Sequence, residues 1–175
     1  KCITNSKFEE DVFHETFWPD TPMLRLGHAR NDVFFDSYKK TRERWRKEFI
    51  TDYALDEDSK FILYAPTFRD THNFAVYDIQ ADRLVNTMSR RFGGKWKLLV
   101  RYHDNDKKNE VVNNRVISEN VIDVTRFPDI QMLLSFVDAG ITDYSSWIYD
   151  YINSRRPAFI YARDIADYNN ERGFY

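Results

Sequence analysis

The sequence predicts an α/β protein with a Rossmann-like, doubly wound and mostly parallel sheet, and three observations carry this prediction. Short apolar runs alternate with helical patterns and are joined by short turns, which is the order of elements in a parallel sheet covered by helices. The run at residues 61–65 is apolar throughout and too short for a helix, as expected for an interior parallel strand. Polar residues follow these runs directly, where sheets of this class bind ligands.

The first third of the chain is predicted to contain two short strands and two helices. A strand is expected at residues 1–5, followed by a helix from Ser6 to residue 17, because Ser6 can cap it and apolar residues recur at helical spacing. Two prolines end this helix, and a strand at 23–26 leads into the polar turn 27–32. The pattern from residue 34 to residue 53 is helical again.

The helix at 34–53 carries a run of basic residues around Trp45 and Phe49, which are four residues apart. A solvated helix face explains this run, and contact with an anionic membrane or polymer is the alternative. The basic residues are Lys39, Lys40, Arg42, Arg44, Arg46 and Lys47.

The same signals predict the remaining elements. Gly93 and Gly94 stop a helix, and the charged, aperiodic stretch 104–115 is predicted to be a surface loop. A buried strand that begins at residue 139 stops at a hydroxyl-rich corner and turns directly into a helix. Strands are thus expected at 61–65, 96–100, 120–125, from 139 and at 157–161, and helices at 78–92, at 129–138 and after the corner.

Length and composition limit the class of protein. The 175 residues, 42% hydrophobic and 17% aromatic, are predicted to form one globular domain, 1–175. Twenty-six basic and 28 acidic side chains leave a formal charge of -2, so no bulk field favours nucleic acid. A single cysteine, no apolar run of about 18 residues and no signal peptide favour a cytoplasmic protein. The start without Met and the end without a tail are expected to be cuts in a longer protein.

Polar and charged side chains follow five predicted strands, and we expect these side chains to meet at one edge of the sheet. At Ser145 and Ser146, free backbone N–H groups and two hydroxyls can bind a diphosphate, with plain N-capping by Ser145 as the alternative. Arg69 and Arg101 can hold phosphate oxygens, with a salt bridge, such as Arg69 to Asp70, as the alternative. The strand-end candidates are His28, Arg30, Thr67, Arg69, Arg101, His103, Thr125, Asp143, Ser145 and Ser146.

His103 is the candidate general acid or base, because an imidazole titrates near neutral pH and lies here beside the predicted phosphate site. A surface histidine is the alternative. His14 and His72 lack partners at metal-ligand spacing, so no metal site is predicted, and nothing indicates that Cys2 is a nucleophile. The glycine motifs of dehydrogenases, P-loop NTPases and α/β-hydrolases do not occur.

Several segments occur together in a specific order. They are Tyr64-Ala65-Pro66-Thr67-Phe68-Arg69-Asp70, Arg101 and His103, Asp123-Val124-Thr125 and Asp129, Ile141-Thr142-Asp143-Tyr144-Ser145-Ser146, Tyr149-Asp150-Tyr151, Arg156-Pro157, Asp164, Tyr168 and Arg172-Gly173-Phe174-Tyr175. In this order they resemble the CDP-glycerol glycerophosphotransferase family, the enzymes that build teichoic acid and related polyol-phosphate polymers. Phe68 stands where the family has Trp. A second departure is Ala29, where the family usually has Pro before Arg-Asn-Asp.

The resemblance implies a GT-B arrangement of two Rossmann-like domains, with this chain as the carboxy-terminal, donor-binding one. It implies a CDP-glycerol or CDP-ribitol donor, a lipid-linked or polymer acceptor, a peripheral position at the inner face of the membrane, and no cofactor. The family's amino-terminal domain, whose His-Gly-Thr-Pro histidine is the base, has no counterpart here, so the fragment alone is expected to be inactive. The implied roles are the diphosphate for Ser145 and Ser146, cationic clamps for Arg69 and Arg101, leaving-group assistance for His103, secondary contacts for Thr67 and Thr125, and orientation of the corner for Asp143.

Two alternatives stay open. The first keeps the fold and changes the donor to a nucleotide sugar such as a UDP-sugar. The second is a non-catalytic domain that recognises polyol-phosphate polymer through the basic residues 39–47.

Overall fold

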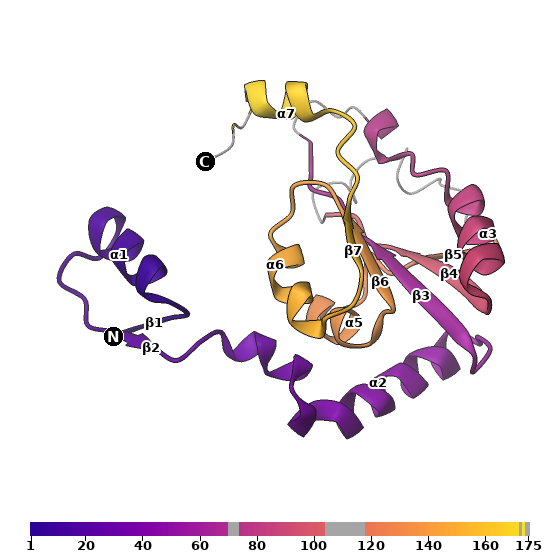
Figure 1. Cartoon of the computed structure of the whole chain (residues 1–175), viewed down its shortest axis with the longest axis horizontal. Coiled ribbons are helices and arrows are strands. Elements are labelled where there is room, and N and C mark those ends of the chain that lie inside the picture. The colour runs from indigo at the N-terminus through magenta and orange to yellow at the C-terminus, as the bar shows by residue number, and fades with distance from the viewer. Residues whose placement is uncertain (70–73, 104–117, 172, 174–175) are drawn as a thin grey trace.

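The computed structural model describes residues 1–69, 74–103, 118–171 and 173. Its centre is a sheet of five parallel strands in the order β5-β4-β3-β6-β7. The chain builds outward from β3 through β4 to β5, and then crosses over to β6 and β7 (Figure 1). The predicted α/β class with a parallel sheet is confirmed. The strands are β3 Ser59–Tyr64, β4 Lys95–Val100, β5 Val121–Asp123, β6 Ala139–Thr142 and β7 Ala158–Ile160.

The central strand β3 is buried on both faces, which explains its uninterrupted apolar run. Phe61 and Leu63 pack into a core formed with helices α2, α5 and α6, whereas Ile62 and Tyr64 pack into a second core against α3. All four side chains are at most 1% exposed. Helices therefore cover both faces of the sheet, as the doubly wound class requires. The helices are α2 Lys39–Asp52, α3 Ala81–Phe92, α5 Ile130–Phe136, α6 Trp147–Tyr151 and α7 Ile165–Glu171.

The register of the strands brings their carboxyl ends to one edge. Tyr64 at the end of β3 pairs with Val100 at the end of β4 and with Ile141 near the end of β6, and Val100 in turn pairs with Asp123 at the end of β5. The crossover from β3 to β6 makes the gap between these two strands the topological switch point, where such sheets bind ligands.

Helix α6 lies close against β6 because Gly140 has no side chain. A Cβ atom at Gly140 would lie 2.9 Å from the indole of Trp147 and 3.1 Å from the ring of Tyr151. The Trp147 indole also donates a hydrogen bond of 2.9 Å to the carbonyl of Ala65. This close approach positions the start of α6 beside the loop that follows β3.

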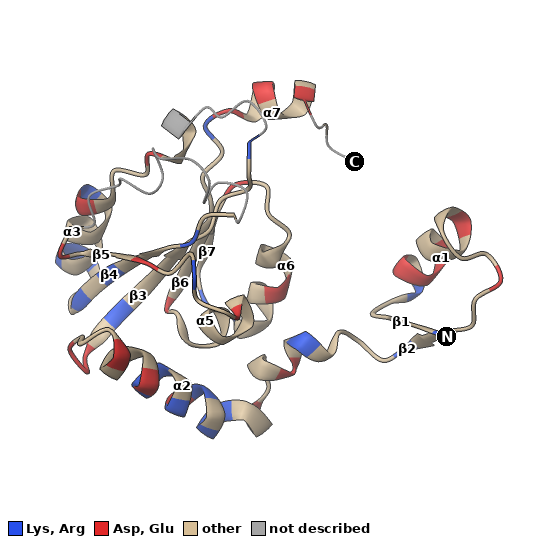
Figure 2. Ribbon diagram, turned by 180° about the vertical axis from the view of Figure 1, so that it is seen from behind, with Lys and Arg blue, Asp and Glu red and all other residues tan. Residues whose placement is uncertain are grey.

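The first strands form a unit of their own. Strands β1 (Cys2–Thr4) and β2 (Met23–Arg25) pair in parallel in a two-stranded sheet, joined by α1 (Lys7–Thr16). Figures 1 and 2 show this unit set apart from the five-stranded sheet. The expectation that five strand ends share one edge is therefore wrong for β2, because β2 pairs with β1 and not with the central sheet.

The other predicted elements agree only in part with the structure. Ser6 caps α1 as predicted, since its hydroxyl accepts a hydrogen bond from the Glu9 backbone N–H. The predicted helix 34–53 begins later, because Ala29–Phe34 and Asp36–Tyr38 form 3-10 turns. Helix α7 was not predicted. The predicted loop 104–115 lies outside the described residues.

Candidate functional site

The loops after β3 and β6 meet at the switch point, and Asp143 joins them. Its Oδ1 accepts hydrogen bonds from the backbone N–H groups of Thr67, at 2.8 Å, and Tyr144, at 2.5 Å. Its Oδ2 accepts one from Nη2 of Arg69 at 2.7 Å. Asp143 is 5% exposed, so this carboxylate is largely shielded from water and holds the backbone of both loops.

Arg69 is buried and surrounded by acceptors. Its Nε and Nη2 donate to the two carboxylate oxygens of Asp164 at 2.6 and 3.1 Å, and its Nη1 donates to the Thr67 carbonyl at 2.5 Å. The guanidinium also lies over the rings of Tyr144 and Tyr168, 4.9 and 5.1 Å from their centroids, and these rings stack on each other. A buried cation with two carboxylate partners has its charge compensated before any ligand binds.

The ion pairs of Arg69 shift the titration of their members. Burial opposes the charge of Arg69, but the hydrogen bond and charge of Asp164 and of Asp143 outweigh it and raise the pKa of Arg69. The hydrogen bonds from Arg69 lower the pKa of Asp164. The salt-bridge alternative is therefore what the structure contains, with Asp143 and Asp164 as partners, whereas Asp70 lies outside the described residues. A phosphate contact by Arg69 stays a prediction.

Arg101 and Thr125 connect the ends of β4 and β5. Arg101 Nη1 donates to the carbonyls of Val124, at 3.1 Å, and Phe127. The buried hydroxyl of Thr125 accepts a hydrogen bond from the Tyr102 backbone N–H at 3.1 Å. Both residues thus shape this edge of the sheet, and their contacts with a ligand stay predictions.

His103 lies at the same edge and is exposed, with its ring 5.8 Å from the ring of Phe68. The structure therefore places this imidazole beyond the end of β4, at the edge of the sheet where β3 and β5 also end. An exposed imidazole in this position is accessible to a ligand, and its role in acid–base chemistry stays a prediction.

The hydroxyl-rich corner begins a short helix. Ser146 is the N-cap residue of α6, and its side chain makes no capping hydrogen bond, so the N-capping alternative, which named Ser145, is not what starts this helix. Helix α6 has only five residues before it continues as a 3-10 turn, so its dipole is smaller than that of a long helix. Ser146 is exposed and Ser145 is half-buried.

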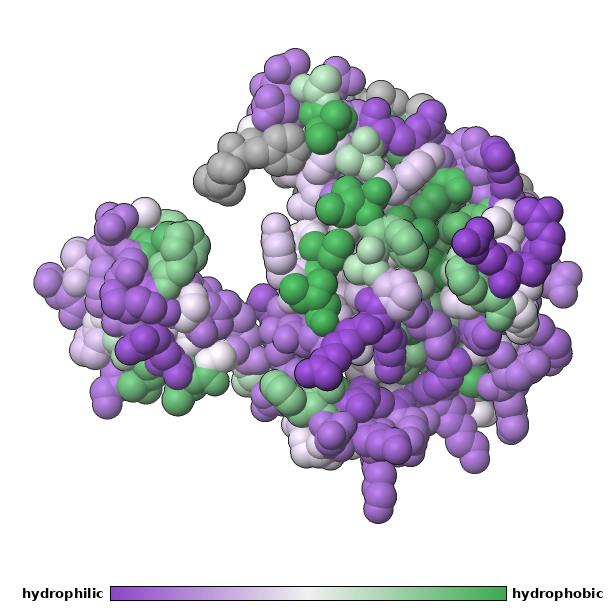
Figure 3. Space-filling model, viewed as in Figure 1, coloured by the Kyte–Doolittle hydropathy of each residue, from purple (hydrophilic) through white to green (hydrophobic). Residues whose placement is uncertain are grey.

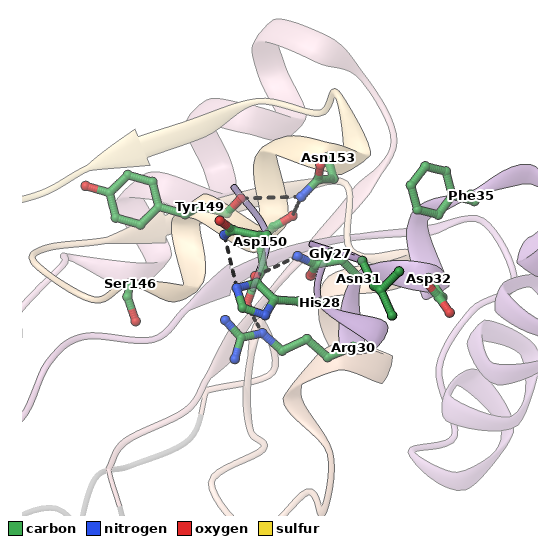
Figure 4. Close-up of a pocket in the computed structure, with 12 residues that line it drawn as sticks. Gly27, His28, Arg30, Asn31, Asp32, Phe35, Ser146, Tyr149, Asp150 and Asn153 are labelled. Atoms are coloured by element: carbon green, nitrogen blue, oxygen red, sulfur yellow. Dashed lines mark hydrogen bonds and ion pairs between the residues drawn. The ribbon is translucent and has the colours of Figure 1, made fainter. Parts of the chain in front are cut away.

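A pocket of about 530 Å³ opens beside Ser146. Figure 4 shows that its walls come from the segment around His28 and Arg30 on one side and from α6 on the other. It is lined by Asn5, Leu26, Gly27, His28, Arg30, Asn31, Asp32, Phe35, Ser146, Tyr149, Asp150 and Asn153. Of the residues predicted for the donor site, Ser146 reaches this pocket, whereas the strand-end candidates His28 and Arg30 enter it from the start of the 3-10 turn Ala29–Phe34.

Asp150 connects the two walls of the pocket. This carboxylate, 7% exposed, accepts hydrogen bonds from Asn31 at 2.9 Å and Gln131 at 3.1 Å, and it pairs with Nε of Arg30 at 3.0 Å. Asp150 was not among the predicted site residues, because Asn31 and Asp150 are 119 positions apart and no local pattern reports such a pair. His28 has its own partners, since its Nε2 lies 3.0 Å from Nδ2 of Asn5 and 3.5 Å from a carboxylate oxygen of Glu9.

The basic run on α2 divides into two groups. Arg42 donates to the carbonyls of Val33 and Phe35, and Arg46 donates to those of Phe136 and Ser59. These two arginines therefore hold the helix against the rest of the protein. The exposed group consists of Lys39, Lys40, Arg44 and Lys47, and Figure 2 colours the basic positions along α2 blue.

The described residues contain neither a cluster of metal ligands nor a membrane-spanning helix. Within 1–69, 74–103, 118–171 and 173, no three His, Cys, Asp or Glu side chains gather as metal ligands would. In the same part of the chain, none of the helices combines the length and apolar character needed to cross a bilayer.

Comparisons with known proteins agree on one family. The sequence model described as CDP-Glycerol:Poly(glycerophosphate) glycerophosphotransferase matches residues 1–175. The teichoic acid poly(glycerol phosphate) polymerase of Staphylococcus epidermidis is 30% identical over 99% of this chain and 24% of the relative. The teichoic acid poly(ribitol-phosphate) polymerase of Bacillus spizizenii is 31% identical over 100% of this chain and 28% of the relative. The teichoic acid glycerol-phosphate transferase of Staphylococcus aureus is 28% identical over 99% of this chain and 44% of the relative.

The solved structure of the wall teichoic acid polymerase TagF superposes on this chain with a TM-score of 0.74 and 30% identity, over 99% of this chain and 42% of that one. A variant of the same polymerase soaked with CDPG matches equally well, with a TM-score of 0.74. The chain thus spans less than half the length of these curated relatives and of this structure.

Proposed function

Because the chain belongs to the CDP-glycerol:poly(glycerophosphate) glycerophosphotransferase family, we propose that it is the donor-binding part of an enzyme that transfers polyol phosphate in the synthesis of a teichoic-acid-like polymer. One observation carries the proposal: the polar residues of the family resemblance, which are far apart in the sequence, meet at the switch point of a parallel sheet. Thr67, Arg69 and Asp143 are in direct contact there.

The proposed reaction is a substitution at phosphorus. An acceptor hydroxyl attacks the β-phosphorus of a CDP-polyol, a new P–O bond forms, and the bond between the β-phosphorus and the bridging oxygen breaks, so that CMP leaves. The hydroxyl proton passes to a base outside this chain. The chain itself contributes binding and charge stabilisation, which supply most of the catalysis in phosphoryl transfer.

The residues of the site form a more exposed group and a buried group. Ser146 is exposed and lines the pocket, His103 is exposed beyond the end of β4, and Ser145 is half-buried. We assign to them the contacts with the diphosphate and with the leaving group. Arg101 is half-buried, with its Nη1 donating to the carbonyls of Val124 and Phe127, and is assigned a cationic contact.

A second group supports the first from inside. Arg69 and Asp143 are buried and form an ion pair, and the buried Thr125 accepts a hydrogen bond from the Tyr102 backbone N–H, so we assign these three to positioning the loops. Thr67 belongs with them through its backbone hydrogen bond, although its buried hydroxyl has no partner among the described residues and is available to a ligand oxygen.

The acceptor site and the second GT-B domain are part of the proposal. The relatives carry more than half of their length outside the match, which leaves room for a domain that supplies the base. On this proposal the 175 residues bind the donor and need the other domain for turnover.

A titration with nucleotides tests the donor assignment. Calorimetry or fluorescence with CDP-glycerol, CMP, UDP and a UDP-sugar is expected to show binding of the cytidine nucleotides, with Ser146→Ala weaker by at least tenfold. Ser89→Ala, at a half-buried serine on α3 that does not line the pocket, is the matched control. A preference for UDP would instead support the nucleotide-sugar alternative. Unchanged binding in Ser146→Ala, with loss when residues 39–47 are neutralised, would support the polymer-binding alternative.

A further inference from the structure

Helix α2 carries a row of exposed basic side chains that the site at the switch point does not use. Lys40, Arg44 and Lys47 are exposed, and steps of four and three residues place them on one face of the helix. At a rise of about 1.5 Å per residue, this row, the α2 row, extends over about 10 Å. The side chains of Lys40 and Lys47 have no hydrogen-bond or ion-pair partner among the described residues, so their charges are available to a ligand.

Acidic side chains border the α2 row on both sides. Helix geometry, with about 100° per residue, confines the row to a stripe about 60° wide, with Glu43 on one side of it and Glu48 on the other. Nε of Arg44 lies 3.6 Å from Glu48, and an exposed pair of this kind contributes little. A flat anionic surface would meet both carboxylates together with the row, whereas a linear chain of anions can follow the row between them.

Helix α2 presents no apolar side chain that can enter a membrane. Every exposed residue of this helix, which the structure describes in full, is polar or charged, and Figure 3 shows a predominantly hydrophilic surface over it. Its apolar residues Trp45, Phe49 and Ile50 pack inward against the core. A helix that lies in the membrane interface buries an apolar face there, so α2 binds an anionic partner through its charges alone.

The α2 row starts beside the pocket. Nη1 of Arg42 donates to the carbonyls of Val33, at 2.8 Å, and Phe35, at 2.6 Å, and Phe35 lines the pocket. One turn later, Nη2 of Arg46 donates to the carbonyl of Ser59, the first residue of β3, at 2.5 Å. Helix α2 therefore runs from the pocket toward the amino end of β3 (Figure 1), and the row runs with it.

We propose that the α2 row binds the acceptor polymer through successive phosphates, a few units behind the polymer end that reacts. The ligand is a linear chain of phosphodiesters. Its negative charges lie one polyol apart, a distance comparable with the steps of about 4.5 to 6 Å along the row.

Binding along the α2 row keeps the growing polymer beside the pocket between additions, which raises the local concentration of its reacting end. The inference rests on the proposed function, because it takes the acceptor to be a polyol-phosphate polymer. It gives the basic helix a role within the transferase, in addition to donor binding at the switch point.

Oligomers of glycerol phosphate with one, two, four and eight units test the inference without a nucleotide. At about 0.15 M salt, the affinity measured by calorimetry is expected to rise at least tenfold from one unit to four and to change little beyond four, because the row is short. In the α2 variant, Lys40→Gln with Arg44→Gln and Lys47→Gln, this dependence on length is expected to disappear. The same dependence in the α2 variant and the unsubstituted chain would overturn the inference.

A matched variant separates the α2 row from the net charge of the chain. Arg83→Gln with Arg90→Gln and Arg91→Gln removes the same charge from exposed positions of α3, which covers the other face of the sheet. This variant is expected to keep the full dependence on oligomer length. If it loses that dependence as well, the oligomers respond only to net charge and the inference fails.

Vesicles of phosphatidylglycerol and phosphatidylcholine at the same salt distinguish a lipid surface from a polymer. If the α2 variant loses vesicle binding and keeps its oligomer binding, the row contacts lipid and the inference is overturned.

A titration with CDP-glycerol separates the inference from the proposed donor site. The α2 variant and the unsubstituted chain are expected to bind CDP-glycerol with affinities within about twofold of each other, because the row does not line the pocket. A chain that binds no CDP-glycerol and still shows the dependence on oligomer length would contradict the donor site and support the polymer row. A tenfold loss of CDP-glycerol affinity in the α2 variant would instead assign the row to the donor and overturn the inference.

Discussion

Arg69 and Asp164 lie 95 positions apart and form a two-pronged ion pair, in which Nε and Nη2 of the guanidinium donate to the two oxygens of one carboxylate at 2.6 and 3.1 Å. This pair connects the loop after β3 to the start of α7, and Asp143 completes it from the loop after β6. The cluster therefore joins three segments at the edge of the sheet where ligands are expected.

The first prediction concerns the stability of this cluster. Asp164→Asn leaves the buried guanidinium with one carboxylate instead of two, and breaking a buried ion pair costs about 3 to 5 kcal/mol. We expect a loss near the lower end, about 3 kcal/mol, because Asp143 remains. Urea unfolding measures it, and Asp167→Asn, at an exposed carboxylate on α7, is the control with a change below about 0.5 kcal/mol. Equal midpoints for the two variants would mean that the pair contributes nothing.

The second prediction is a pH dependence. Hydrogen bonds from Arg69 lower the pKa of Asp164 in the folded state, so the unfolded chain binds this proton more tightly. The stabilisation is thus fully present above the unfolded carboxyl pKa of about 4 and is lost as the pH falls through the lower, folded value. Unfolding free energies between pH 7 and pH 2 are expected to fall less steeply for Asp164→Asn than for the unsubstituted chain. Parallel curves would contradict the pKa shift.

The third prediction distinguishes a positioning role of Arg69 from a phosphate clamp. With the guanidinium 4% exposed and each of its nitrogens bonded, we expect Arg69→Gln and Asp164→Asn to weaken CDP-glycerol binding to a similar extent, within about threefold of each other. Calorimetric affinities at a temperature where both variants are folded decide the question. A loss of 100-fold or more in Arg69→Gln alone would show that the guanidinium binds the ligand directly.

The fourth prediction tests the close approach of α6 to β6. In Gly140→Ala the added methyl group would lie 2.9 Å from Trp147 and 3.1 Å from Tyr151, so the helix must shift. Overpacking of this kind costs about 1 to 3 kcal/mol, measured by urea unfolding. A shift of α6 also moves Ser146, so nucleotide affinity is expected to fall in the folded variant. If stability falls and affinity does not, the corner is independent of the helix position.

The fifth prediction concerns the membrane. We expect the triple variant Lys39→Gln, Lys40→Gln and Lys47→Gln to reduce sedimentation with anionic liposomes at low salt without changing the melting temperature, because these side chains are exposed. Arg46→Gln is expected to lower the melting temperature, because Arg46 donates hydrogen bonds to the carbonyls of Phe136 and Ser59. If the unsubstituted chain does not sediment at all, the basic face is a solvated surface.

The strands and most helices followed from local signals. The apolar run at 61–65 is buried on both faces, and Ser6 and Gly93 mark helix ends as their capping chemistry requires. The start of α2 was placed too early, because 3-10 turns and an α-helix share apolar spacing over one turn. The short α7 went unpredicted because its seven residues carry little amphipathic signal.

The sequence by itself determined the class of sheet and the edge at which the polar groups gather, because parallel strands place all their carboxyl ends on one side. Only the tertiary structure decided the partners: that Arg69 pairs with Asp143 and Asp164, that Asp150 receives Arg30 and Asn31, and that β2 pairs with β1 and not with the central sheet. Apart from the strand pair, these partners lie 74 to 120 positions apart in the sequence. Contacts of that kind depend on how the packed elements meet, and no local pattern encodes them.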